Sequence, residues 1–254
     1  MTDYVKYWCS CLEVAVKTFD LTREFGPIHA LNKLNLKVDA GQIFGLIGPN
    51  GAGKTTALRI ISTLLLPTSG TVEVFGLNVA SKAADVRKII SYLPEEAGAY
   101  RNLSGWEYLR FMGGFRTTDK NELKTMIDDA AQISGLKDRL NDRVKTYSKG
   151  MKRRLLVARS LMTKPKLAIL DEPGSGLDVL HAFHVREIIK KYVKDYGVTI
   201  LLSSHNMLEV EYVCDNVVLL NKGKIVAAGK PQELKDRFGS ANLEEVFAKV
   251  VGFA

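Results

Sequence analysis

The sequence predicts an α/β fold built on a mainly parallel sheet with helices on both faces. Three short segments at residues 42–47 (QIFGLI), 166–170 (KLAIL) and 198–203 (VTILLS) are apolar and rich in β-forming residues. They alternate along the chain with segments of helical pattern, and they are nearly continuous in hydrophobicity. This combination is typical of parallel strands buried on both faces. A chain of 254 residues is long enough for one such core and one sizeable insertion.

The first half of the chain predicts a second, antiparallel set of strands. Residues 12–21 and 34–38 alternate apolar and polar side chains, as half-buried antiparallel strands do. After the strand at 42–47 comes a glycine-rich loop, then a helical pattern at 55–66 and a short strand at 71–74. The middle of the chain has helical patterns at 106–112 and 122–133 and no clear strand. We therefore expect residues 94–146 to form a helical subdomain inserted into the core.

The α/β pattern then resumes. A helix is predicted at 148–162 with a serine at its start, followed by the strand at 166–170, a helix at 182–195, and strands at 198–203 and 217–220. Residues 231–254 predict one or two short helices. The expected organisation is a single domain over 1–254, with its core at 12–93 and 147–230, the helical subdomain at 94–146 and a C-terminal tail at 231–254.

Composition and charge indicate a folded globular protein, but they do not identify its binding partner. Hydrophobic residues are 46% and charged residues 25% of the chain, which is ordinary for a folded globular protein. The formal net charge of +8 is compatible with nucleic acid, anionic lipid or acidic protein as partner. The basic residues are dispersed, except for the group in residues 149–154.

Membrane segments and metal-binding cysteines are not indicated. The longest apolar runs, 60–66 and 198–202, are too short to cross a bilayer, and residues 1–11 do not have the pattern of a secretory signal. Any membrane role is therefore expected to be peripheral. The cysteines, Cys9, Cys11 and Cys214, do not have zinc-site spacing, so buried or free thiols in a reducing cytosol are expected.

Residues 48–55 (GPNGAGKT) fit the phosphate-binding pattern G-x-x-x-x-G-K-[ST]. They follow a predicted strand and open a predicted helix, which is the context that this motif requires. Its glycines allow the backbone to wrap around phosphate, and the helix N-terminus adds partial positive charge. Lys54 would reach the β- and γ-phosphates, and the Thr55 hydroxyl would bind Mg²⁺. The motif predicts a P-loop NTPase core, a class that includes kinases, GTPases, recombinases and transport ATPases.

Two acidic residues follow the predicted strand at 166–170. Because ligands bind at the carboxyl ends of parallel strands, Asp171 could hold Mg²⁺ through water and Glu172 could deprotonate the attacking water. The alternative is that both are solvated acids in a loop. His205 follows the strand at 198–203 and could donate a hydrogen bond to the γ-phosphate, although a lone histidine there is often structural. For His29, His181 and His184, the sequence favours a structural role.

The order of the motifs resembles one family, the ATPase subunits of ATP-binding-cassette (ABC) transporters. The chain shows GPNGAGKTT at 48–56, YSKGM at 147–151, LAILDEP at 167–173, SGLD at 175–178 and then His205. In that family these are the Walker A motif, the signature, the Walker B motif with its catalytic glutamate, the D-loop and the switch histidine. The resemblance covers about residues 12 to 229.

The resemblance implies a mechanism and a set of site residues. Two subunits would form a head-to-tail dimer with two ATP molecules between them, so that Ser148 and Gly150 contact the γ-phosphate held by the partner. Ser148 could also be an ordinary helix N-cap. Phe25 occupies the position that stacks on adenine, with a packed core residue as the alternative. The implied catalytic residues are Glu172 and His205, the implied Mg²⁺ ligands are Thr55, Glu95 and Asp171, and the implied ATP contacts are Phe25, Asn50, Gly51, Ala52, Gly53, Lys54, Thr55, Thr56, Glu95, Ser148, Gly150, Asp171 and Asp178.

Two departures from the family pattern point to one branch of it. Glu95 replaces the glutamine that usually follows Pro94, and the signature carries Lys149 and Met151 in place of glycine and glutamine. Both departures, and the tail at 233–247, resemble exporters with a separate ABC-2-type permease, including sodium and drug exporters. That branch implies a peripheral protein on the cytoplasmic side of the cell membrane.

The implied partners are a second copy or a related ATPase subunit and a separate transmembrane permease, with the permease contacting residues 95–103. Nucleic acid is not an expected partner. The main alternative is a soluble ABC ATPase that acts on nucleic acid or ribosomes, although such proteins usually carry two cassettes or a long coiled-coil insertion. A nucleotide-binding regulator without turnover is a third possibility, which the presence of Glu172 disfavours.

Overall fold

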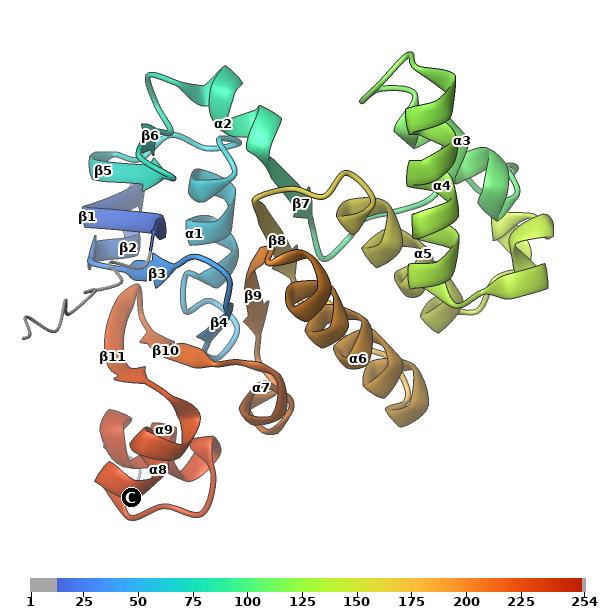
Figure 1. Ribbon diagram of the computed structural model, residues 1–254. Helices are drawn as coiled ribbons and strands as arrows, with labels where there is room; N and C mark the ends of the chain where they lie inside the picture. Colours follow the sequence, from blue (N-terminus) through green and yellow to red (C-terminus); the bar gives the residue numbers. More distant parts are fainter. Residues whose placement is uncertain (1–12, 253–254) are drawn as a thin grey trace, which may run out of the picture.

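The computed structural model describes residues 13–252, and its strands form two sheets on either side of helix α1 (Lys54–Ile61) (Figure 1). The first sheet is antiparallel and has the order β2-β1-β5-β6, with β3 also paired to β1. Its strands are β1 (Val14–Phe25), β2 (Ile28–Leu34), β3 (Lys37–Asp39), β5 (Ser69–Val74) and β6 (Leu77–Asn78). This sheet confirms the antiparallel part of the predicted fold class.

The second sheet has the order β11-β10-β4-β9-β8-β7 and is parallel except for β11. Its strands are β4 (Ile43–Ile47), β7 (Ile90–Leu93), β8 (Leu167–Asp171), β9 (Thr199–Ser204), β10 (Asn216–Asn221) and β11 (Lys224–Gly229). Every residue of β4, β8 and β9 is buried. The near-continuous apolar runs thus did predict strands that are covered on both faces.

The side chains of each buried strand point alternately into two separate hydrophobic cores. In β4, Phe44 and Leu46 pack into a core shared with α1 and the antiparallel sheet, whereas Ile43 and Ile47 pack on the opposite face. That opposite core continues through α5 (Lys149–Leu161), α6 (Val179–Tyr196) and α7 (Met207–Val213). Because successive side chains of a strand point to opposite faces, one strand contributes side chains to both cores.

The segment between β7 and β8 is helical and lies beyond β7, on the far side of the parallel sheet from the antiparallel strands (Figure 1). It holds α3 (Gly105–Gly113), α4 (Lys120–Ser134), the 3₁₀ helices η1 (Lys137–Asn141) and η2 (Val144–Thr146), and α5. Helix α3 begins at a capping box, in which Ser104 and Glu107 satisfy each other's backbone N–H groups. The chain ends in α8 (Pro231–Phe238) and α9 (Leu243–Val251).

Several elements differ from the sequence prediction. The helix expected at 55–66 ends at Ile61, because Thr63 adopts a left-handed conformation with φ of 65° and the chain turns there. The helix expected at 182–195 begins at Val179, because Asp178 caps it through the His181 N–H. The prediction also missed some short elements. These are β2, β6, β7, β11, α7 and α2 (Ala83–Ile89).

Within the described range, no helix is long and apolar enough to span a membrane. Cys214 is a buried free thiol, and burial raises its pKa. Cys9 and Cys11, which were predicted to be free or buried thiols, lie outside the described residues.

Candidate active site

Most of the predicted site residues meet at the carboxyl ends of four adjacent parallel strands. In the order β4-β9-β8-β7, these strands lead into the P-loop, into His205, into Asp171 and Glu172, and into Glu95. The register places Ile47 beside Ser204 and Asp171 beside Ser203, so the strands end at the same level. The fold therefore brings together residues that are more than a hundred positions apart in the sequence.

The P-loop has the backbone geometry that its glycines allow. Gly53 has φ of 107°, and a Cβ atom there would lie 2.5 Å from the Ala30 carbonyl oxygen, so no other residue fits without movement. Helix α1 starts at the next residue and its N-terminus has no side-chain cap, which leaves its backbone N–H groups available to an anion. The Lys54 ammonium is buried, with Nζ 2.7 Å from the Gly48 carbonyl oxygen and 3.3 Å from that of Pro49.

A cavity of about 320 Å³ opens over this loop. Its wall joins residues from β1 and β2, the P-loop, and the loops that follow β7 and β8. The lining residues are Phe25, Ile28, His29, Ala30, Asn50, Gly51, Ala52, Gly53, Lys54, Thr55, Thr56, Glu95 and Glu172. Phe25 is 44% exposed, with the Arg23 guanidinium 4.5 Å from its ring centroid, so it lies at the rim and outside the packed core.

Asp171 is buried at the end of β8, and its carboxylate is surrounded by hydroxyl groups. Oδ1 accepts hydrogen bonds from Thr55 Oγ1 at 3.2 Å and from Ser203 Oγ at 2.5 Å, and Oδ2 accepts one from the Tyr92 hydroxyl at 3.4 Å. Burial and the neighbouring Asp171 charge raise the pKa of Tyr92 to about 12, so the phenol stays protonated and donates.

Oxygen donors of this kind suit Mg²⁺. Thr55 and Asp171 present a hydroxyl and a carboxylate within hydrogen-bonding distance, and the exposed Glu95 lines the P-loop cavity together with Thr55. Within residues 13–252 no group of three or more His, Cys, Asp or Glu side chains is placed to hold a metal ion. A full protein cage is not what Mg²⁺ needs, since it commonly binds one or two protein oxygens together with substrate phosphates and water.

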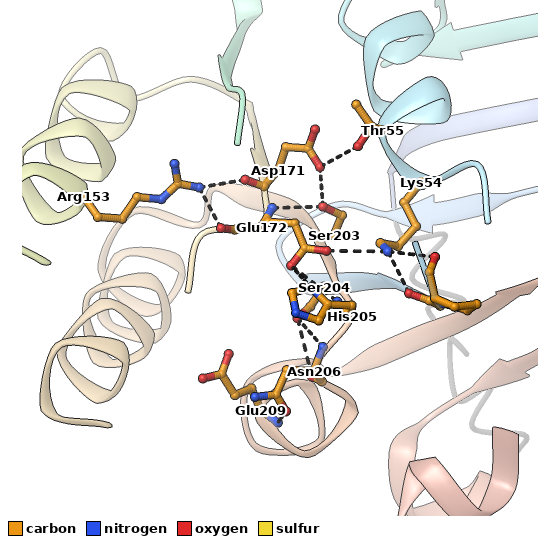
Figure 2. Close-up of polar contacts among 12 residues, drawn as sticks. Lys54, Thr55, Arg153, Asp171, Glu172, Ser203, Ser204, His205, Asn206 and Glu209 are labelled. Carbon is orange, nitrogen blue, oxygen red and sulfur yellow. Dashed lines mark hydrogen bonds and ion pairs between the residues drawn. The ribbon is translucent and has the colours of Figure 1, made fainter. Parts of the chain in front are cut away.

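Glu172 lies between two nitrogen groups at the centre of the site (Figure 2). Its Oε1 is 3.5 Å from Lys54 Nζ, and its Oε2 is 2.9 Å from His205 Nδ1 and 3.4 Å from the His205 backbone nitrogen. The Glu172 side chain is 6% exposed, whereas that of His205 is 48% exposed. The carboxylate is therefore fixed at the floor of the cavity, while the imidazole remains accessible. The backbone of Glu172 is itself unusual, with φ of 48°.

Besides Tyr92, the site residues Ser203 and Arg153 were not found from the sequence. Ser203 accepts a hydrogen bond from the Glu172 N–H at 3.0 Å and donates to Asp171, so it fixes both acids. Arg153 is buried on α5 and donates to backbone carbonyl oxygens in the loops after β7 and β8, and Figure 2 shows its contacts with Asp171 and Glu172. Ser203 could have been predicted as a site residue from its position at the end of an apolar strand. Arg153 lies in the basic group at residues 149–154, where no sequence feature distinguishes it from its neighbours.

The signature residues lie apart from the P-loop cavity of their own chain. Ser148 is exposed and caps α5 by accepting from the Met151 N–H at 3.1 Å, as the N-cap interpretation predicts. Gly150 is buried, and a Cβ atom there would lie 2.2 Å from His181 Cδ2. The exposed Asp178 caps α6. Among the described residues, those that line the cavity over the P-loop do not include these three.

Comparison with known proteins places this geometry in a family. The family model described as ABC transporter matches residues 31–175, which is more than half of the chain. The chain belongs to the ABC transporter family. Its fold and motif order confirm the P-loop NTPase class, and it is an ATP-binding ATPase subunit of that family.

Individual relatives agree with the family. The ABC transporter ATP-binding protein NatA of Bacillus subtilis is 34% identical over 87% of this chain and 89% of its own length. The bacitracin transport ATP-binding protein BcrA of Enterococcus faecalis is 35% identical over 89% of this chain and 72% of its own. A solved ATP-binding subunit of an ABC transporter superposes with a TM-score of 0.82 and 29% identity, covering 93% of this chain and 99% of that one. These relatives favour a transport subunit over an ATPase that acts on nucleic acid.

Proposed function

We propose that this ABC subunit hydrolyses Mg²⁺-bound ATP with Glu172 as the general base. The observation that carries the proposal is the position of the Glu172 carboxylate, between Lys54 Nζ and His205 Nδ1 on the floor of the P-loop cavity. A buried carboxylate at this point can accept a proton from water that attacks a phosphate held by the loop.

The neighbouring residues divide the remaining tasks. Lys54 and the backbone N–H groups at the start of α1 would bind the phosphates, and Phe25 at the rim would stack on the adenine. Thr55, Asp171 and Glu95 would hold Mg²⁺, which neutralises the charge of the phosphates. His205 would donate a hydrogen bond to the γ-phosphate, since its exposed imidazole is already oriented by Glu172.

The active site would be completed by a second copy or a related ATPase subunit. Ser148 and Gly150 lie outside their own chain's cavity, so a head-to-tail partner would bring them to the γ-phosphate. The exposed apolar residues Val179 and Leu180, each 80% exposed, follow Asp178 at the start of α6 and support a partner surface there. Ser148 is suited to bind phosphate because it lies at a helix N-terminus.

ATP hydrolysis would drive export through a separate transmembrane permease, with this chain on the cytoplasmic side of the membrane. The similarity to transport subunits and the departures at Glu95 and Met151 support this assignment. The permease would contact residues 95–103. We also propose that residues 94–146 form the helical subdomain of a single ABC ATPase domain and that 231–254 form its tail.

Two variants test the proposed chemistry. Glu172→Gln should retain ATP binding and lose hydrolysis by about 100-fold or more, because only the base is removed. Lys54→Ala should weaken ATP binding itself, because a charged phosphate contact is removed. Nucleotide binding and phosphate release are measured for both. Hydrolysis by Glu172→Gln at the wild-type rate would show that Glu172 is not the base.

A further inference from the structure

The two tail helices, α8 and α9, lie against α7 and β11, at the edge of the parallel sheet that is remote from the helical segment (Figure 1). Both helices bury aliphatic side chains in the hydrophobic core that also contains the apolar face of α7. In the tail these fully buried side chains are Leu234, Leu243 and Val246. Among residues 13–252, none of those that line the P-loop cavity belongs to α8 or α9. Any effect of the tail on ATP must therefore pass through another element.

One carboxylate on α7 joins both tail helices to the core. Glu211 Oε1 accepts a hydrogen bond from the backbone N–H of Leu243, the first residue of α9, and Glu211 Oε2 lies 3.6 Å from Lys235 Nζ on α8. The side chains of Glu211 and Lys235 are 17% and 20% exposed. The first N–H groups of a helix have no partner within it, and negative charge is favourable there. Glu211 thus gives α9 an acceptor and a complementary charge from another element.

A second carboxylate fixes the other side of α7. Glu209 Oε1 lies 3.1 Å from Arg186 Nη1 on α6. Because each residue of an α-helix is rotated by about 100° from the one before it, Glu209 and Glu211 point to nearly opposite sides. A helix of seven residues is too short to be stable without tertiary contacts. The position of α7 is therefore set by α6 on one side and by the tail on the other.

Helix α7 begins two residues after His205. Asn206 caps the helix by accepting from the Glu209 N–H at 3.1 Å, and its own N–H donates to Ser204 Oγ at 3.0 Å. His205 lies between the end of β9 and this cap, with Nδ1 2.9 Å from Glu172 Oε2. A displacement of α7 would therefore be transmitted to the imidazole through a single residue.

We propose that Glu211 is a positioning residue, which holds His205 against Glu172 by fixing α7 to the docked tail. The inference rests on the proposed function, in which His205 donates to the γ-phosphate, and it names what keeps the imidazole in place. A donor to a reacting phosphate is effective only while its position is held closely. Loss of the tail contact should consequently slow ATP hydrolysis and leave ATP binding at the P-loop intact.

The first experiment separates kcat from KM. Glu211→Ala in the full chain should lower kcat for ATP by about fivefold or more, while KM should change by less than about twofold, because the P-loop is untouched. Glu211→Gln should recover most of kcat, since its amide oxygen can still accept from the Leu243 N–H. Glu233→Ala is the matched control, because it removes an exposed α8 carboxylate that pairs with the neighbouring Lys230. Its kcat should stay within about twofold of wild type.

The second experiment reads the position of His205 without nucleotide. Ring signals of the four histidines are recorded by NMR on the full chain, and His205→Ala identifies the signal of His205. Glu211→Ala should shift or broaden this signal and leave that of His29, on β2, unchanged. A residue that serves stability alone would lower the unfolding temperature without moving the His205 signal. If Glu211→Ala does not fold, Lys235→Met, which keeps the α9 contact, should give a smaller change of the same kind.

A third measurement asks whether Glu211 acts through His205. In the His205→Ala background, Glu211→Ala should lower the single-turnover rate of phosphate release by less than about twofold, because the group that it positions is already gone. An equal loss of rate in both backgrounds would overturn the inference, and so would an unchanged His205 signal in Glu211→Ala.

Failure of the proposed function gives a different result. In that case His205→Ala hydrolyses ATP at the wild-type rate, and the kinetic effect of Glu211→Ala disappears while the His205 signal still moves. The role of His205 in hydrolysis is then wrong, although Glu211 positions its side chain. If His205→Ala is slow but the His205 signal does not respond to Glu211, only the positioning inference is overturned.

Discussion

The guanidinium of Arg153 donates a hydrogen bond to the backbone carbonyl of Glu172, with Nη2 2.8 Å from the oxygen. The same side chain also donates to the carbonyl oxygens of Asp171, Pro173 and Glu95. Burial lowers the pKa of this guanidinium, and the nearby acids Asp171, Glu95 and Glu172 oppose that effect. One residue on the signature helix α5 therefore holds the left-handed turn at Glu172 and ties it to the loop after β7.

Replacing Arg153 should affect both stability and catalysis. Arg153→Met leaves several buried carbonyl oxygens without donors, so the free energy of unfolding should fall by about 2–3 kcal/mol in urea denaturation. The turn at Glu172 would relax, and kcat for ATP should fall by about 100-fold with a smaller change in KM. Arg153→Lys should restore only part of both, because an ammonium cannot reach all the carbonyls.

Lys152→Met is the matched control for Arg153, since it removes a neighbouring cation on the same helix that forms no ion pair within residues 13–252. Its stability and kcat should stay close to wild type. If Arg153→Met lowers stability but leaves kcat unchanged, the residue has a structural role alone.

Ser203 should be important for ATP hydrolysis, because its hydroxyl group forms hydrogen bonds with both Asp171 and Glu172. Ser203→Ala removes the donor to Asp171 and the acceptor for the Glu172 N–H. A hydrogen bond to a charged group contributes about 1.5–3 kcal/mol, so ATP hydrolysis should fall roughly tenfold or more in a phosphate-release assay. Ser204→Ala is the control, since that buried hydroxyl bonds to Asn206 instead. Equal effects of the two substitutions would contradict this role for Ser203.

Mixing two inactive variants tests whether each site is shared between chains. Glu172→Gln and Ser148→Arg should each be inactive as homodimers, because every site then carries one defect. In a mixed dimer one site collects both defects and the other is intact, so activity should return to roughly a quarter of wild type after subunit exchange.

The mixing experiment needs two checks. Ser148→Arg also removes the N-cap of α5, which costs about 1 kcal/mol, so its folding is verified by circular dichroism. Subunit exchange is verified with two differently tagged chains. Full exchange without any recovery of activity would exclude a role for the signature in the partner's site.

Cys214 should be almost inert in the folded protein. Its side chain is buried and its pKa is raised by burial, so little thiolate forms at pH 8. In a Cys9→Ser/Cys11→Ser variant, the remaining thiol should react with Ellman's reagent at least ~100-fold more slowly in buffer than in guanidinium chloride. Because the pKa is raised, the native rate should still be increasing between pH 8 and pH 9. Rapid labelling of the native variant would contradict the burial of this residue.

Long or strongly patterned elements could be predicted from the sequence. The strands at 166–170 and 198–203 and the helix at 148–162 differ from the observed elements by one residue at each end. Short elements such as β7 and α7 were missed, because four to seven residues give too little periodicity to separate a strand from a loop. The end of α1 was placed too late, since Ile61 and the apolar residues after it continue the helical pattern while the backbone turns at Thr63.

The sequence by itself determined the phosphate loop, the two acids and the family order of motifs, because these depend on local chemistry at fixed spacing. Lys54, Asp171, Glu172 and His205 could be assigned in this way. Only the tertiary structure decided that Ser203 links the two acids and that Arg153 reaches, from α5, the two loops that follow β7 and β8. It also decided that Glu211 joins α7 to both tail helices. Such contacts join residues from distant parts of the chain, and they arise from strand order and helix packing, which no local pattern encodes.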